Sequence, residues 1–78
     1  MAGVEKIVWE DISGFDGAWY EPSEVLSAKT TIVTTVGQVV SDTPTHVILA
    51  SSWTDDGNYG NINVIPMSCV LSREPLDI

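Results

Sequence analysis

A run of residues branched at Cβ, from Thr30 to Val36, most strongly limits how this chain can fold. It consists of Thr, Ile and Val, whose side chains lose rotamer freedom in a helix and suit the pleated surface of a strand. From this run to Leu71, strand-like segments alternate with turn residues, and no helical pattern intervenes. The second half of the chain therefore predicts a small antiparallel β-unit.

Four further segments have the composition of strands. They are Val4–Ile12, His46–Trp53, Asn61–Ile65 and Val70–Leu71. The first is short and is expected at a sheet edge, whereas His46–Trp53 has apolar residues on both faces, which is typical of an interior strand. Turns are predicted where proline, glycine and short polar residues gather, at Asp42–Thr45, Asp55–Gly60 and Pro66–Cys69. Pro75 is expected to end the ordered part.

The segment between the first two strands lacks the composition of a strand. Gly14 and Gly17 flank apolar and acidic residues in Ser13–Tyr20, which predicts a loop. Pro22 is suited to the first turn of a short helix that runs through Leu26. Gly37 interrupts the strand that begins with the branched run, and it predicts a bulge or a sharp bend.

Together these elements predict an all-β fold: a small SH3-like half-open barrel of about five antiparallel strands, with a long first loop and at most one short helix. The 78 residues are enough for a single domain, residues 1–78. An OB-like barrel and a curved sheet that pairs with a second subunit are the alternatives. Because 44% of the residues are hydrophobic and a small core is thin, we also expect a homo-oligomer with shared apolar faces.

The net charge of −8 repels phosphate backbones, so direct nucleic-acid binding is not expected. Six of the acidic residues fall within the first 24 positions: Glu5, Glu10, Asp11, Asp16, Glu21 and Glu24. This uneven distribution suits a basic partner, although excess acidic charge also serves solubility.

Cys69 is the only cysteine, so the chain cannot form an internal disulfide, and a lone cysteine in an apolar run is typically a small buried hydrophobe. The sequence has no signal-like segment and no apolar run long enough to span a membrane. We therefore expect a protein of a reducing cytoplasm with no membrane partner.

No arrangement of residues predicts catalysis. His46 is the only histidine and stands beside a turn without a nucleophile, which favours a structural or exposed role. Asp55, Asp56 and Asn58 supply oxygen atoms, but their spacing does not match a calcium loop. We expect no enzyme activity, no catalytic residues, no metal and no cofactor.

Aromatic residues are the better candidates for function, because four of them fall in or beside predicted loops. Tyrosine and tryptophan provide large, rigid contact surfaces. The predicted binding residues are Trp19, Tyr20, Trp53, Asp55, Asp56, Asn58, Tyr59 and Arg73. The alternative interpretation is that the aromatic rings close the ends of the core.

Short motifs distributed along most of the chain carry a family resemblance. They are Trp9-Glu10-Asp11, Gly17-Ala18-Trp19, Thr35-Val36-Gly37, Val47-Ile48-Leu49-Ala50, Asp56-Gly57 and Ile65-Pro66. In this order they make the chain resemble small uncharacterised proteins encoded by bacteriophages. The resemblance implies a setting, the cytoplasm of a bacterial host, and provides no catalytic residues.

Three functions follow as hypotheses. The leading one is a non-enzymatic binding module of the phage type, a counter-defence or host-modifying factor that binds and masks a host or defence protein. The second is an oligomeric sponge that sequesters a nucleotide-like immune second messenger, with phosphates held by Arg73, Lys29 or backbone amides. The third is a virion or assembly component.

Overall fold

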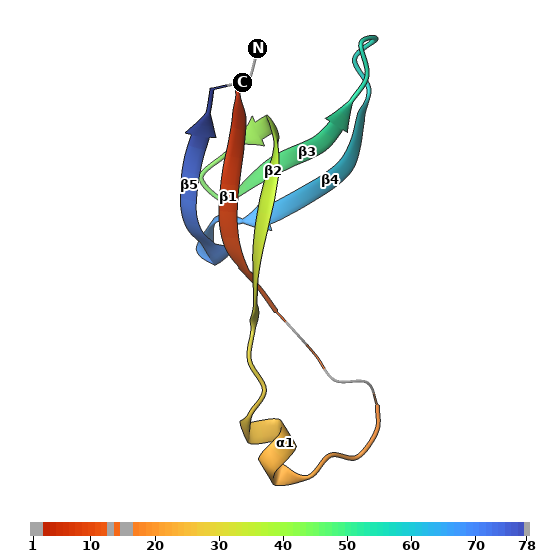
Figure 1. Cartoon of the computed structure of the whole chain (residues 1–78), viewed down its shortest axis with the longest axis vertical. Helices are drawn as coiled ribbons and strands as arrows, with labels where there is room; N and C mark the ends of the chain where they lie inside the picture. The colour runs from red at the N-terminus through yellow and green to blue at the C-terminus, as the bar shows by residue number, and fades with distance from the viewer. Residues whose placement is uncertain (1–2, 13, 15–16, 78) are drawn as a thin grey trace.

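Five strands form one antiparallel sheet in the computed structural model, which describes residues 3–12, 14 and 17–77 (Figure 1). The strands are β1 (Val4–Asp11), β2 (Thr31–Asp42), β3 (His46–Trp53), β4 (Tyr59–Pro66) and β5 (Val70–Leu76). Two short helical elements accompany them, α1 (Pro22–Leu26) and the 3-10 turn η1 (Met67–Cys69). The strand order is β4-β3-β2-β1-β5 and the sheet is not closed. The all-β prediction is confirmed, and the open sheet is consistent with a half-open barrel.

Two predictions about the strands are wrong. β1 lies between β2 and β5 instead of at an edge, because the C-terminal segment returns to pair with it. β5 also continues through Pro75 to Leu76, where Pro75 lies opposite Glu5. Proline is tolerated there because β5 is an edge strand, so the missing N–H group need not weaken a second ladder. The interior position of β3, between β2 and β4, is confirmed.

Gly37 lies on β2 directly against the backbone of β3. A Cβ atom at this position would lie 2.6 Å from the carbonyl oxygen of Ala50, so only glycine fits without a backbone shift. The break in strand register occurs slightly later, between Val39 and Ser41. Gly37 therefore permits close approach of the two strands, and the extra residue Val40 supplies the bulge.

The core lies on one face of the curved sheet. Its buried members are Ile7, Val39, Val47, Leu49 and Ile65. Trp9, Met67, Cys69 and Val70 are partly buried against this cluster. Cys69 is thus an apolar packing residue at intermediate burial. The small cluster draws on all five strands or their connections, which explains how one core holds the whole sheet together.

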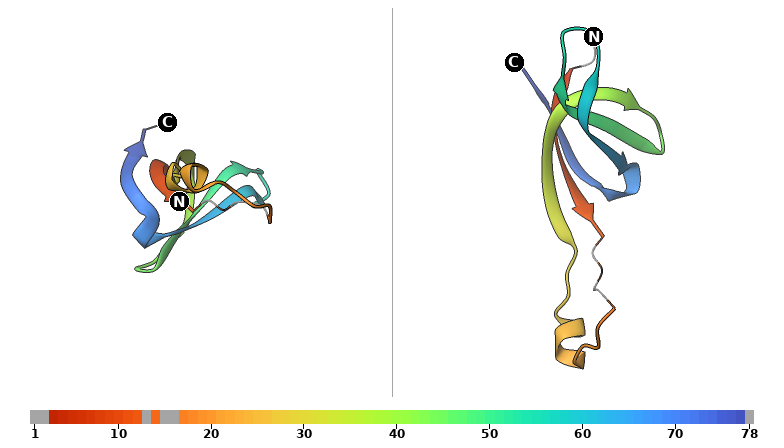
Figure 2. Two further views of the ribbon diagram at one scale, coloured as in Figure 1. Left: turned by 90° about the horizontal axis from the view of Figure 1, so that it is seen from below. Right: turned by 90° about the vertical axis from the view of Figure 1, so that its right-hand side faces the viewer.

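The connection between β1 and β2 extends away from the sheet, as the views in Figures 1 and 2 agree. We call the described part of this connection, residues 12, 14 and 17–30, the arm. Its predicted helix is confirmed as α1, which begins at Pro22. Within the predicted loop, Ser13, Phe15 and Asp16 lie outside the described residues, and Gly14 and residues 17–20 have no regular structure. The longest dimension of the molecule is 50 Å, against 23 and 22 Å across.

Candidate functional site

The arm exposes large apolar side chains. Their exposed fractions are 84% for Ile12, 101% for Trp19, 39% for Tyr20, 52% for Val25 and 85% for Leu26. Every described residue of the arm is exposed, so none of these described side chains contributes to the core. A concentration of uncovered apolar surface on a small protein indicates an interaction site.

The tip of the arm is the five-residue helix α1, which does not pack against the sheet (Figure 1). Glu21 has an extended backbone, Pro22 starts the helix and Glu24 lies in the first turn, which suits the positive helix end. No residue of α1 is buried. Because an isolated helix this short is marginal in water, contact with another surface would stabilise it.

Acidic residues lie at the end of β1, next to the base of the arm, and at the tip of the arm. Glu10 and Asp11 end β1, and Glu21 and Glu24 flank the start of α1. At the base, the hydroxyl of Thr30 donates a hydrogen bond of 2.6 Å to a carboxylate oxygen of Glu10, joining the two sides of the connection. The apolar side chains of the arm are therefore bordered by acids, which suits a partner with basic residues around an apolar groove.

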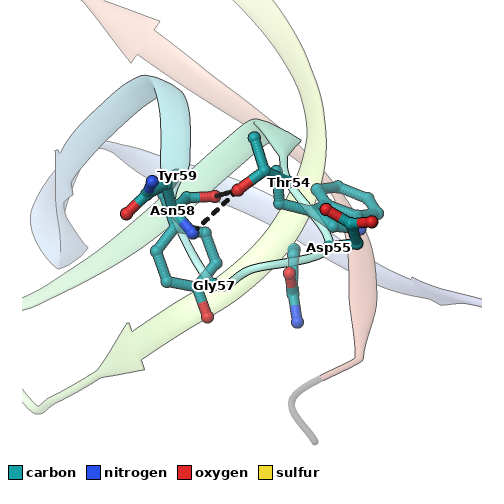
Figure 3. A pocket seen from close by; sticks show the side chains of 7 residues that line it. Thr54, Asp55, Gly57, Asn58 and Tyr59 are labelled. Atoms are coloured by element: carbon teal, nitrogen blue, oxygen red, sulfur yellow. Dashed lines mark hydrogen bonds between the residues drawn. The ribbon is translucent and has the colours of Figure 1, made fainter.

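A second candidate site is a pocket of about 200 Å³ at the turn between β3 and β4 (Figure 3). It is lined by Gln38, Trp53, Thr54, Asp55, Gly57, Asn58 and Tyr59. Trp53 and Tyr59 are direct cross-strand partners, which places their side chains next to each other on one face. Each is 48% exposed.

Hydrogen bonds between Thr54 and Asn58 hold the turn that forms the pocket. The amide of Thr54 donates to the carbonyl of Asn58 over 2.9 Å, and the amide of Asn58 donates to the Thr54 hydroxyl over 3.0 Å. Gly57 has a φ of 95°, a left-handed conformation that favours glycine. The Thr54 hydroxyl donates in turn to Asp56, which takes that carboxylate into the internal bonding of the turn.

Arg73 lies on β5 and is bound to two carboxylates of the protein itself. Its Nε and Nη2 atoms donate to Glu5 over 2.8 and 2.9 Å, and Nη2 also bonds Asp42 over 2.9 Å. Donating hydrogen bonds to the carboxylates of Glu5 and Asp42 raises the pKa of Arg73, and the hydrogen bond from Arg73 lowers the pKa of Asp42. Asp42 ends β2, so the guanidinium links the far end of β2 to β1 and β5. Its geometry fits a structural cross-link of the curved sheet.

The predicted binding residues thus fall into three places. Trp53, Asp55, Asn58 and Tyr59 meet at the pocket, with Asp56 in the same turn. Trp19 and Tyr20 lie on the arm. Arg73 lies on β5, in the ion cluster that it forms with Glu5 and Asp42. The sequence interpretation missed Gln38, although a single amide within an apolar strand is a signal of a special environment. It also missed Ile12, Val25 and Leu26, whose exposure no sequence pattern indicates.

The remaining chemical candidates show no catalytic grouping. The Nδ1 atom of His46 lies 2.8 Å from the Thr45 hydroxyl and 3.4 Å from that of Thr43, within the turn between β2 and β3. Glu10 and Asp11 are consecutive strand residues and point to opposite faces. Among residues 3–12, 14 and 17–77, no group of three or more His, Cys, Asp or Glu side chains could hold a metal ion.

Comparison with known proteins adds no family. No protein-family model, curated protein or solved structure matches the chain. The resemblance to phage-encoded proteins therefore stays a prediction. In the part of the chain that the structure describes, no helix is long and apolar enough to cross a membrane.

Proposed function

We propose that the chain is a non-enzymatic binding module that holds a protein partner through the arm. The observation that carries this proposal is the set of large apolar side chains that the arm leaves uncovered, with Trp19 at 101% exposure. Tryptophan is a frequent anchor at protein interfaces because it buries a large rigid surface at little entropic cost. The sheet supplies a stable base, and the arm supplies the contact.

The negative charge of the molecule favours a partner with basic residues at its binding surface. The chain carries a net charge of −8, and the arm presents Glu21 and Glu24 beside Val25 and Leu26. Complementary charge speeds encounter and suppresses wrong partners. We therefore propose a partner with an apolar groove and a basic rim. The phage resemblance implies a host or defence protein in the bacterial cytoplasm, which the module would mask.

Site-specific photo-crosslinking in bacterial cells tests this function. A photoreactive phenylalanine analogue replaces Trp19 on the arm or, as a matched control, Leu71 on β5, which is 55% exposed. We expect one discrete protein adduct from position 19 and none of that mass from position 71. Adding Leu26→Ser should reduce the adduct at least about tenfold if the arm binds as a unit. Adducts of equal yield from both positions would contradict an arm-directed function.

An assembly component is the second candidate, and the reach of the arm favours it. A segment that extends beyond its own sheet can contact a neighbouring subunit in a larger structure, and the 50 Å length of the molecule is about twice its width. The discriminating measurement is whether the protein is present at fixed stoichiometry in purified phage particles. Its absence from particles would leave the masking function.

The nucleotide sponge has weaker support from the described residues. The pocket is smaller than the roughly 300–1,000 Å³ of typical small-molecule sites. No lysine or arginine lines it, and Arg73 is bound to Glu5 and Asp42. A homo-oligomer also stays a prediction, and the mass of the protein in solution tests it.

A further inference from the structure

We propose that the pocket at the β3–β4 turn is a binding site for an alkylammonium or guanidinium cation. This site is separate from the arm, since in Figure 1 the β3–β4 turn and the arm extend from the sheet in different directions. The inference therefore goes beyond the proposed function and does not depend on it.

Two aromatic rings provide the first part of the argument. Trp53 and Tyr59 face each other across the strands that lead into the turn, and both line the pocket. The face of an aromatic ring attracts cations through its quadrupole, and tryptophan and tyrosine attract them most strongly. Both side chains are only half-exposed, so a cation between them would be partly removed from water, where the attraction is stronger.

Charge provides the second part. Asp55 lines the pocket, and its carboxylate has no hydrogen bond or ion pair with any described residue. No lysine, arginine or histidine lines the pocket. The surrounding protein, with a net charge of −8, raises the local concentration of cations. The site is therefore suited to a positive group and unsuited to a phosphate.

Gln38 provides the third part. It is 7% exposed and lines the pocket, yet its side chain has no hydrogen-bond partner among the described residues. No buried side-chain nitrogen or oxygen of those residues is left unsatisfied, so the amide of Gln38 must reach open space, which the pocket supplies. Its carbonyl oxygen can accept a hydrogen bond from an N–H donor of a bound guanidinium or primary ammonium group.

Shape and rigidity decide the size of the ligand. At about 200 Å³ the pocket suits a single cationic head group or one lysine or arginine side chain. The bonds between Thr54 and Asn58 hold its rim in place, as Figure 3 shows. Because these hydrogen bonds fix the turn, binding costs little additional ordering.

Titration of the intact, isotope-labelled protein tests the proposal by nuclear magnetic resonance at constant ionic strength. The probes are tetramethylammonium, N-acetyl-arginine methylamide, a pentapeptide with a central arginine and, as the neutral control, N-acetyl-norleucine methylamide. We expect saturable shifts of the Gly57 and Asn58 amides and the Trp53 indole, with a Kd on the order of 1–10 mM. The Trp19 indole is the internal reference and should not shift.

The source of the cation follows from the same titration. If the arginine pentapeptide binds at least about tenfold more tightly than both single groups, the natural ligand is a side chain of a protein. If tetramethylammonium binds as tightly as the arginine pentapeptide, the natural ligand is a free ammonium compound. Absence of saturable shifts with every cation, or equal shifts with the norleucine control, would overturn the site.

Two variants separate the contributions. Asp55→Asn should weaken cation binding about fivefold or more while leaving the fold intact, and Asp77→Asn, which removes the same charge near the chain end, should have little effect. Tyr59→Leu keeps an apolar side chain and removes the ring, and it should weaken binding by a similar factor. Should Tyr59→Leu disturb the hairpin, the exposed Asp55→Asn variant still decides the result. Unchanged affinity in Asp55→Asn would contradict the proposal.

Discussion

The sheet buries part of its apolar side chains in a core, whereas the described residues of the arm bury none. Leu49 on β3 is fully buried, whereas Leu26 on the arm is 85% exposed. Trp9 packs against the core and its Nε1 atom donates to the Thr35 hydroxyl over 3.0 Å, whereas Trp19 is fully exposed. The exposed apolar residues of the arm do not stabilise the fold, and we propose that they bind a partner.

The two leucines give the largest expected contrast. Leu49→Ala should lower the free energy of unfolding by about 2–5 kcal/mol, because it leaves a cavity in a core of few residues. Leu26→Ala should change it by less than about 0.5 kcal/mol, since the side chain is already in water. Urea unfolding followed by tryptophan fluorescence measures both. Comparable losses in the two variants would show that the arm folds back onto the sheet in solution.

The glycines of the sheet give the next contrast. Gly37→Ala would bring a Cβ atom to 2.6 Å from the Ala50 carbonyl oxygen and should cost about 2–3 kcal/mol, because backbone has to move. Gly60→Ala meets only the Ser52 Cβ at 3.7 Å and should be tolerated. The midpoint of urea unfolding compares the variants. If Gly37→Ala were as stable as the wild type, the close contact between β2 and β3 at Gly37 would be contradicted.

The ion cluster concerns the sheet alone. Arg73→Gln removes the donors that satisfy Glu5, whose side chain is only 17% exposed, and should cost about 1–2 kcal/mol of unfolding free energy. Lys6→Gln is the control, because the Lys6–Glu74 pair is largely exposed and should contribute little. Equal effects of the two substitutions would argue that the Arg73 cluster does not hold the curved sheet.

The same cluster predicts a modest dependence of stability on pH. In the folded protein the hydrogen bond from Arg73 lowers the pKa of Asp42 below its ordinary value of 3.8. Its stabilising effect is therefore complete above that value and is lost as the pH falls through the lower, folded-state pKa. Wild-type protein should lose more stability than Arg73→Gln on acidification below about pH 4. Parallel pH profiles of thermal unfolding would contradict this coupling.

The smallest expected effect on stability belongs to the arm. Trp19→Ser should leave the unfolding midpoint unchanged within error, since the ring makes no buried contact, while partner adducts formed from a photoreactive residue at Leu26 should be lost. Circular dichroism and crosslinking measure the two properties on the same sample. A large loss of stability with unchanged crosslinking would reverse the assignment of roles to sheet and arm.

Local chemistry made several parts of the fold predictable. The branched run from Thr30 to Val36 favoured a strand and Pro22 marked the start of α1. The turn predicted at Asp55–Gly60 is present, but its last two residues, Tyr59 and Gly60, begin β4. These features depend on the conformational preferences of neighbouring residues. The gathering of Trp53, Asp55, Asn58 and Tyr59 was also accessible, because a short hairpin turn brings nearby residues together.

Contacts between distant segments were not accessible in the same way. Gln38 joins the pocket only because β2 pairs with β3, and Arg73 meets Asp42 only because β2 bends around the core. β1 became an interior strand only when β5 returned to it, which also carried Pro75 into a strand. Each of these depends on long-range pairing, which local preferences do not encode.

An all-β chain with a short helix, an acidic surface and a set of turns could be predicted from local chemistry, because strand, helix and turn preferences and charge are properties of residues and their neighbours. Which apolar residues are covered depends on how distant segments pack. Leu49 and Leu26 are chemically identical, and only the path of the chain buries one in the core and leaves the other on the arm. Burial is a property of packing between distant segments, and in this protein it separates the residues that hold the fold from those available to bind.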